Sequence, residues 1–287
     1  MVDGLAVVDK PAGCTSHDVV GRCRRIFGQK RVGHAGTLDP DATGVLLVGL
    51  GRATRLLKYI AELPKTYAAE IVLGTSTSTL DASGDVTGTW DMPHVTLEDV
   101  ATAAKAFVGD IDQIPPMVSA VQVGGKRLHQ LARAGLEVER APRSVHVHRF
   151  DILRERSPGV IEAEVECSTG TYVRTLADDL GRALGGGAHL RGLRRTAIGP
   201  FVADAAHALD ELGPDEVLPP AAIVGHLASV TIDDDRAADV ACGRPLLGVP
   251  AKQPFVAVLD AAGALLAVYR NDESGARLVA DVVLAAT

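Results

Sequence analysis

The sequence predicts an α+β protein built around a mixed β-sheet. Helix-like and strand-like segments are interspersed along the chain without the regular alternation that is typical of a doubly wound fold. Near the C-terminus, two alternating segments, 254–260 and 264–270, flank a glycine turn and predict an antiparallel hairpin. The 287 residues are 47% hydrophobic and 23% charged, which is typical of a soluble globular protein with a substantial core.

The N-terminal segment predicts a helix, a glycine-rich loop, a strand and a second helix. Ser16 is the expected N-cap of a helix over 16–27, which a glycine ends. The loop over 33–44 precedes an apolar run, "VLLVGLG", that predicts a buried strand. The next segment, 52–63, has helical spacing and stops before Pro64.

The central segment predicts strands mixed with helices and loops. A polar loop is expected over 75–88, and Thr96 with Asp99 predicts a capping box at the start of the following helix. Residues 114–135 predict an extended piece, a glycine turn and a short basic helix. The remaining elements of this segment are strands over 65–74, 144–153 and 159–169 and a helix over 172–184.

A domain boundary is expected near 213–228, where proline, glycine and alanine replace the regular patterns. The roughly 60 residues beyond it are rich in strand signals and predict a small β module. We therefore expect two domains, 1–228 and 229–287.

The charge distribution indicates a localised anionic partner. The net charge of −7 argues against indiscriminate nucleic-acid binding. Two acid-free basic clusters nevertheless stand out: Arg22, Arg24, Arg25, Lys30 and Arg31, and later Arg191, Arg194 and Arg195. From charge alone, a pair of solvated helix and loop faces is the favoured explanation of these clusters.

The sequence predicts a cytoplasmic protein. The first ten residues do not resemble a secretory signal, because no basic segment precedes an apolar one. The most apolar run, "TGVLLVGLG", is shorter than the about 20 residues that a membrane-spanning helix needs. The four cysteines are widely spaced and form no C-x-x-C pair, which favours reduced thiols over a zinc site or disulfides.

The stretch "GHAGTLDPDATG" allows three interpretations: a calcium loop, a surface turn, or a rigid loop that presents one catalytic carboxylate. It matches the first half of an EF-hand loop from Asp39, but the twelfth position, which needs a bidentate glutamate, is Leu50. The calcium interpretation therefore fails. A simple Asp-Pro turn explains Pro40 but neither the glycines and His34 upstream nor the buried strand downstream. A carboxylate held in one geometry, that of Asp39, explains all of them.

Two further residues have the chemistry that such a carboxylate needs. Arg174 lies in the first turn of its predicted helix, where the macrodipole disfavours a cation, so we expect it to face an anion. Either Asp178 one turn along or Asp39 fits, and a pair with Asp39 would keep that carboxylate ionised. Tyr67 is either an ordinary core tyrosine or a stacking surface for an unstacked base.

Five collinear blocks resemble one family. They are "DKPAGCTSHDVV", "GHAGTLDPDATGVLLVGLGRATR", "KTYAAEIVLGTST", "PPMVSAVQVGGKRLHQLARAG" and "CSTGTYVRTLADDLGRALGGGAHLRGLRRT". Together these blocks, from about Leu5 to Thr196, resemble the bacterial tRNA pseudouridine synthase B (TruB) family. Two positions depart from the family pattern: Asp41, where the family usually has leucine, and Val118, where it usually has an aromatic residue.

The resemblance implies isomerisation of uridine to pseudouridine at position 55 of the tRNA T loop. It implies Asp39 as nucleophile, Tyr67 as the stacking residue near the C5 proton, and Arg174 as the partner of the aspartate. It also implies a nucleotide pocket that is lined by His34, Tyr67, Tyr172 and Leu193. The implied fold is a pseudouridine synthase-type mixed sheet flanked by helices, with an RNA-clamping insertion over 115–142 and a C-terminal PUA-like RNA-binding module.

The chemistry agrees with this expectation. The reaction breaks the N1–C1′ bond and rejoins the base through C5, so it consumes no water overall and oxidises nothing. We therefore expect no cofactor and no metal. The resemblance implies a T stem-loop of tRNA as partner, and we expect the protein to be a monomer. Whether Asp39 attacks C6 of the base or C1′ of the ribose is left open by the sequence.

Two alternatives remain: a catalytically silent RNA-binding protein, and a glycosidase-like hydrolase that uses Asp39 with Asp41. His146 and His148, on one face of a strand, form a further metal-binding candidate, although packed or exposed strand histidines are commoner.

Overall fold

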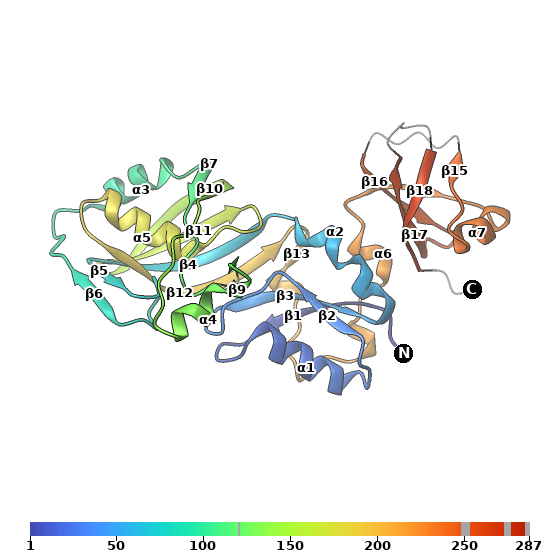
Figure 1. Ribbon diagram of the computed structural model, residues 1–287, viewed down its shortest axis with the longest axis horizontal. Helices are drawn as coiled ribbons and strands as arrows, with labels where there is room; N and C mark the ends of the chain where they lie inside the picture. Colours follow the sequence, from blue (N-terminus) through green and yellow to red (C-terminus); the bar gives the residue numbers. More distant parts are fainter. Residues whose placement is uncertain (120, 248–252, 273–276, 285–287) are drawn as a thin grey trace. The chain divides into compact units, whose positions relative to one another are not determined.

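The computed structural model describes residues 1–119, 121–247, 253–272 and 277–284 (Figure 1). The chain forms two compact units. The first comprises Met1–Pro40, Val45–Glu62 and Asp204–Thr287, and the second comprises Asp41–Gly44 and Leu63–Ala203.

The first unit begins with a small sheet that is covered by one helix. Strand β3 (Thr43–Leu50) pairs with β1 (Gly4–Lys10) and, antiparallel, with β2 (Val32–Ala35). Helix α1 (Ser16–Ile26) buries Val19, Val20 and Cys23 in a cluster with apolar residues of these strands. Because the strands contribute near-continuous apolar runs, this sheet is buried on both faces.

The start of α1 differs from the prediction. Thr15, not Ser16, is the N-cap: its hydroxyl accepts from the Asp18 amide, and the Asp18 carboxylate accepts from the Thr15 amide. This reciprocal capping box uses the aspartate three residues along, which suits Thr15 and not Ser16. The Ser16 hydroxyl is buried instead and bonds the backbone of Leu38.

The helix predicted over 52–63 is wrong in detail. The chain forms a 3₁₀ helix, η1 (Gly51–Leu56), and then one short α-helix, α2 (Leu57–Ala61). The Thr54 hydroxyl donates to the Gly51 carbonyl three residues back, which fits the tighter winding of η1. The segment ends before Pro64, as expected for the residues that precede a proline.

The C-terminal part of the first unit is a five-stranded sheet. The strand order is β14 (Ala228–Thr231), β16 (Phe255–Leu259), β17 (Leu265–Asn271), β18 (Arg277–Val283) and β15 (Leu246–Leu247). Helix α7 (Asp234–Ala241) packs on it, and helix α6 (Pro220–Ile223) precedes it. The predicted hairpin is confirmed: β16 and β17 pair antiparallel, with Val256 opposite Tyr269. This sheet has an apolar cluster of its own, which the fully buried Tyr269 joins.

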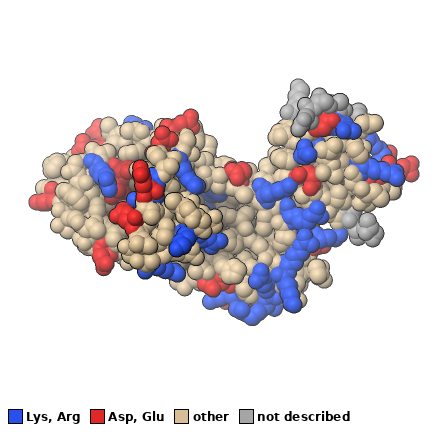
Figure 2. Space-filling view, in the orientation of Figure 1, with Lys and Arg blue, Asp and Glu red and all other residues tan. Residues whose placement is uncertain are grey.

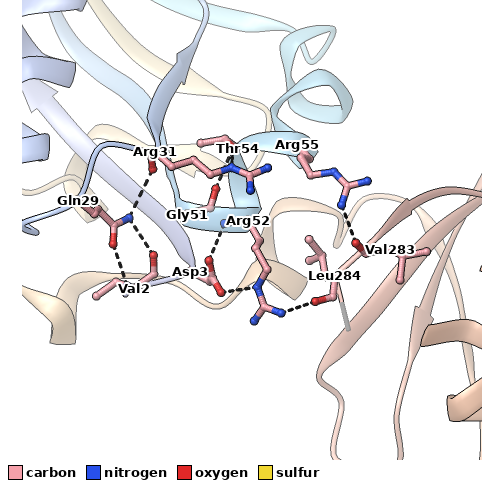
Figure 3. A network of polar contacts seen from close by, with 10 residues as sticks. All are labelled: Val2, Asp3, Gln29, Arg31, Gly51, Arg52, Thr54, Arg55, Val283 and Leu284. Atoms are coloured by element: carbon pink, nitrogen blue, oxygen red, sulfur yellow. Dashed lines mark hydrogen bonds and ion pairs between the residues drawn. The ribbon is translucent and has the colours of Figure 1, made fainter. Parts of the chain in front are cut away.

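Polar contacts fasten strand β18 and the residue after it to η1 and α2 within the same unit, and Figure 3 shows the contacts that η1 makes. Arg52 pairs with Asp3 at 2.7 Å and donates to the carbonyl oxygen of Leu284 at 2.6 Å. Arg55 donates to the carbonyl oxygen of Val283 at 2.8 Å. The Asp281 carboxylate accepts from Lys58 and from the Tyr59 hydroxyl. Basic side chains of η1 and α2 thus hold the end of the described chain.

The second unit is a larger sheet that carries two helices on it (Figure 1). The first residues of β3 pair parallel with β12 (Ala188–Ile198), and antiparallel strands follow in the order β4 (Lys65–Leu73), β11 (Val160–Cys167), β10 (Arg143–Ser157) and β7 (Gly109–Gln113). Strand β13 (Phe201–Val202) extends β12. Helix α3 (Leu97–Lys105) packs against β10, and helix α5 (Val173–Ala183) packs against β12.

Short elements decorate this sheet. A hairpin of β5 (Thr75–Thr77) and β6 (Val86–Thr89) stands where the sequence predicted a polar loop. Between β7 and β10, β8 (Gln122–Val123), β9 (Lys126–Arg127) and α4 (Leu128–Arg133) form the predicted extended piece, glycine turn and short helix. The capping box of Thr96 and Asp99 on α3 is confirmed. Among the described residues, none of the helices is long and apolar enough to cross a membrane.

Candidate active site

The loop that carries Asp39 is held on both sides by specific hydrogen bonds. Upstream, the buried Ser16 hydroxyl accepts from the Leu38 amide at 2.9 Å and donates to the Leu38 carbonyl at 3.2 Å. Downstream, the Pro40 carbonyl accepts from the Gly13 amide at 3.0 Å and from the Lys10 ammonium at 2.8 Å. A half-buried aspartate between two fixed neighbours is what the sequence predicted for this segment.

Lys10 is the centre of this support. Its side chain is fully buried, and its ammonium donates to the carbonyl oxygens of Pro11, Cys14 and Pro40 at 2.7–2.9 Å. A buried ammonium is stable only when its protons are paired, so these carbonyls fix its position and it fixes theirs. The segment after β1 and the segment after Asp39 are thereby joined.

Glycine is required where this loop enters β3. Gly44 has φ of +99°, and a Cβ at this position would lie 2.1 Å from the carbonyl oxygen of Arg195. The close approach allows the parallel pairing of Gly44 with Arg195 on β12. Asp41, three residues earlier, is exposed.

His34 and Asp39 belong to the first unit, where His34 lies on β2 opposite Val48. Tyr67, Tyr172, Arg174 and Leu193 belong to the second. The predicted pair of Asp39 with Arg174 therefore stays a prediction.

Tyr67 and Leu193 lie on neighbouring strands of one sheet. Tyr67 of β4 is opposite Arg195 of β12, and Ala69 is opposite Leu193. Because paired residues of antiparallel strands project to the same side, Tyr67 and Leu193 share a face of the sheet. Tyr67 is 8% exposed and is the third residue of β4, so it is a buried side chain near the start of its strand.

Arg174 is almost fully buried, and oxygens of Thr79, Val118 and Asp81 lie beside its guanidinium. It donates to the Thr79 carbonyl at 3.1 Å and to the Val118 carbonyl at 2.9 Å, and it pairs with the Asp81 carboxylate at 3.3 Å. Arg174 therefore does face an anion, but this anion is Asp81, which the sequence did not indicate. Asp178 instead pairs with Arg182 one turn along at 2.9 Å. An arginine so held cannot swing to a new position without breaking several bonds.

Asp81 is a partner of Arg174 that no motif in the sequence indicated. Its carboxylate also accepts from Thr79 and from Ser83, and it lies next to Leu80, the only non-glycine residue with positive φ (62°) in the described part of the chain. Such backbone strain is kept where the surrounding contacts over-determine it. The Ser- and Thr-rich segment resembled a solvated loop, and the aspartate within it was the one available signal.

Comparison with known proteins identifies the family. Residues 24–173 match the family profile described as TruB family pseudouridylate synthase (N terminal domain), and residues 174–216 match the tRNA pseudouridylate synthase B C-terminal domain. This chain belongs to the TruB family.

Relatives within the TruB family cover most of the chain. A protein of Symbiobacterium thermophilum named tRNA pseudouridine synthase B is 54% identical over 84% of this chain and 82% of its own length. A protein of the same name from Mycobacterium tuberculosis is 46% identical over 96% of this chain and 95% of its own length.

Solved structures confirm the pseudouridine synthase fold. An H/ACA RNP bound to a substrate RNA that contains 2′-deoxyuridine has a chain with a TM-score of 0.74 and 26% identity, covering 99% of this chain and 85% of that one. A Cbf5–Nop10–Gar1 complex gives a TM-score of 0.74 and 28% identity over 98% and 84% of the two chains. The mixed sheet, the flanking helices and the C-terminal β-sheet are thus those of the family.

One of the two predicted basic clusters lies on the surface of this TruB family member. Figure 2 shows Lys and Arg side chains gathered over the part of the first unit that holds α1. All five residues of the first cluster are exposed. In the second cluster, Arg195 is only 1% exposed and Arg191 pairs with Glu70 at 3.0 Å, so this cluster is not the surface that the sequence predicted.

The histidine pair considered as a metal candidate lies on β10. The rings of His146 and His148 are 4.6 Å apart, and His146 Nδ1 is 2.7 Å from the Asp110 carboxylate. Among the residues that the structure describes, no group of three or more His, Cys, Asp or Glu side chains is placed to hold a metal ion.

Proposed function

We propose that this protein isomerises uridine 55 of the tRNA T loop to pseudouridine, with Asp39 as the nucleophile. The observation that carries the proposal is the loop around Asp39, whose two neighbours are fixed by Ser16 and Lys10. A nucleophilic carboxylate must meet a flipped base in one geometry, and this loop is built to hold one. Membership of the TruB family and relatives named tRNA pseudouridine synthase B support the same reaction.

In this proposal the reacting base leaves the RNA stack before any bond is broken. Tyr67 offers a ring for stacking and a hydroxyl near the C5 proton, and Leu193 supplies an apolar neighbour on the same face of the sheet. His34 and Tyr172 complete the walls of the nucleotide pocket.

Asp39 then attacks either C6 of the uracil or C1′ of the ribose, and the N1–C1′ bond breaks. The uracil turns, and C5 bonds to C1′. If Asp39 attacked C1′, this step displaces its carboxylate; if it attacked C6, the Asp39–C6 bond breaks afterwards, so the free carboxylate returns on either route. C5 loses its proton to an acceptor that the Tyr67 hydroxyl provides or relays, and N1 takes up one proton, so no atom is gained or lost overall. Arg174 keeps a cation beside the reacting carboxylate, and Asp81 holds that arginine in place.

The RNA partner proposed is the T stem-loop of tRNA, bound by a monomer. The exposed arginines of α1 are suited to neutralise phosphates of the stem, because each arginine that meets a phosphate releases a counterion. The segment 115–142, of which Ala120 lies outside the described residues, is proposed to close on the RNA, and the module over 229–287 is proposed to add a second RNA contact.

The test compares Asp39→Asn with Asp41→Asn, since both variants make the same chemical change two residues apart. An unmodified T-arm stem-loop is incubated with each variant and assayed for pseudouridine, and affinity is measured separately. We expect no turnover by Asp39→Asn at nearly unchanged affinity, and activity close to that of the parent for Asp41→Asn. Pseudouridine made by Asp39→Asn would overturn the assignment, and free uracil released by the parent would establish a hydrolase instead.

A further inference from the structure

A buried glutamine grips the residue that starts helix α5. Gln113, the last residue of β7, is 1% exposed. Its side-chain oxygen accepts from the Tyr172 amide at 2.9 Å, and its side-chain nitrogen donates to the Tyr172 carbonyl at 3.1 Å. The two bonds join one side-chain amide to the amide and carbonyl of one residue, across 59 positions of sequence.

The two bonds from Gln113 hold the residue that starts helix α5 in place. Tyr172 is the N-cap of α5, and it has no side-chain hydrogen bond to the first turn. Its carbonyl also accepts the first helical bond, from Leu176 at 3.2 Å. Because the N-cap residue determines where a helix begins, fixing both polar groups of Tyr172 fixes the axis and the start of α5.

The scaffold behind Gln113 is rigid. β7 pairs with β10, and Gln113 lies opposite Arg143, so the two residues mark the ends of the segment that the sequence identified as an insertion. Arg174, two residues after Tyr172, donates to Val118 within that segment. Gln113 therefore joins the base of the insertion to the part of α5 that carries Tyr172 and Arg174.

We propose that Gln113 is a positioning residue for the reaction: by gripping the Tyr172 backbone it places the Tyr172 ring and the Arg174 guanidinium in their working geometry. The inference rests on the proposed function, since it assumes that these two side chains act on the nucleotide and on Asp39. Gln113 itself touches neither.

The chain offers a matched control. Gln29, 8% exposed, makes the same two bonds with Val2 in the first unit: its oxygen accepts from the Val2 amide at 2.9 Å and its nitrogen donates to the Val2 carbonyl at 3.0 Å (Figure 3). Val2 leads into β1 and is not part of the proposed site. Gln29 also donates to the Arg31 carbonyl at 3.5 Å. Removing either grip takes one partner from a half-buried amide and one from a half-buried carbonyl, so both changes should lower stability similarly.

The experiment measures Gln113→Met and Gln29→Met in the full-length protein. Methionine keeps the length of the side chain and removes both hydrogen bonds. For each variant we would measure the single-turnover rate at saturating T-arm RNA, the affinity, the melting temperature, and amide exchange at the gripped residue. We expect Gln113→Met to slow the single-turnover step roughly 10–100-fold, because small misplacements of catalytic groups have such effects. Gln29→Met should keep the parent rate despite a similar loss of melting temperature.

A second variant separates geometry from folding. In Gln113→Glu, the ionised carboxylate still accepts from the Tyr172 amide but repels the Tyr172 carbonyl. The protonated acid restores the donor, and burial favours the protonated form. The rate of Gln113→Glu relative to the parent should therefore rise as the pH falls, while no such recovery is expected for Gln113→Met.

Each outcome is decisive. Equal single-turnover rates for the two methionine variants would overturn the positioning role, as would a Gln113→Glu variant whose relative rate does not change with pH. If Gln113→Met does not fold, Gln113→Glu at low pH still tests the inference. Failure of the proposed function is recognised separately, because then the parent makes no pseudouridine or Asp39→Asn still does.

Discussion

Replacing Lys10 with methionine removes the ammonium that joins the segment after β1 to the segment after Asp39. The aliphatic stem and most of the volume remain, so the change removes the ammonium and its hydrogen bonds of 2.7–2.9 Å to the carbonyl oxygens of Pro11, Cys14 and Pro40. A bond to a charged donor contributes about 1.5–3 kcal/mol, but the variant also no longer buries a charge, which offsets part of the loss. We expect a net destabilisation of about 3 kcal/mol, or roughly 6–12 °C in melting temperature.

Thermal denaturation of the parent, Lys10→Met and Lys58→Met gives the comparison. Lys58 is a half-exposed lysine whose partner is the Asp281 carboxylate, so its loss should cost only about 0–1 kcal/mol. Lys10→Met should also slow single turnover more than it weakens RNA binding, because Pro40 loses one of its two fixed contacts beside Asp39. A Lys10→Met variant that melts with the parent and turns over at the parent rate would refute the role of the ammonium.

Three other outcomes are expected. RNA affinity should fall as the salt concentration rises. Arg24→Ala or Arg25→Ala should each reduce the slope of log affinity against log salt concentration by roughly one unit. An unchanged slope would mean that these arginines contact only solvent. Tyr67→Phe should bind RNA normally but react slowly, and Tyr67→Leu should also lose about 1–3 kcal/mol of affinity; a fully active Tyr67→Phe would leave the hydroxyl without a role. Burial opposes ionisation of Asp281, but hydrogen bonds from a lysine and a tyrosine outweigh this effect and lower the pKa of the carboxyl group. The ionised carboxylate therefore stabilises the fold above its ordinary pKa of 3.8. The difference in melting temperature between the parent and Asp281→Asn should shrink as the pH falls below that value.

Sequence patterns predicted most long elements because their signals are local. The capping box on α3, the hairpin of β16 and β17, and the strands β4, β10 and β11 all follow from alternation or from a cap within a few residues. Strand β12 was not predicted because its three arginines obscured the apolar pattern, and Arg195 among them is buried. The sheet pairs that bury this arginine are distant in sequence, so its charge indicated a surface that the fold does not provide.

The site was predicted in part for the same reason. The glycines and the proline around Asp39 were enough to predict a rigid loop at this position. The partners that hold the site residues were not, because Asp81 lies 93 positions from Arg174 in a loop without periodic pattern, and Gln113 acts on a distant backbone. A hydrogen bond from a side chain to a remote carbonyl leaves no mark at the accepting position, since every residue type has a carbonyl.

Such a hydrogen bond requires a particular side chain at the donor but only a main-chain oxygen at the acceptor, so the bond itself does not restrict the residue type at the accepting position. Arg174 bonds to the main-chain oxygen of Val118, whose side chain is exposed, so a change of residue type at this position leaves the bond in place. The oxygens that Arg52 and Arg55 reach also belong to the backbone, of Leu284 and Val283, but there the side chains are needed for packing: Leu284 is 5% exposed, and Val283 packs against the apolar cluster of the C-terminal sheet. Tolerance of substitution should therefore be high at residue 118 and low at the arginines. A library that randomises residue 118 should retain far more working proteins than one that randomises Arg174.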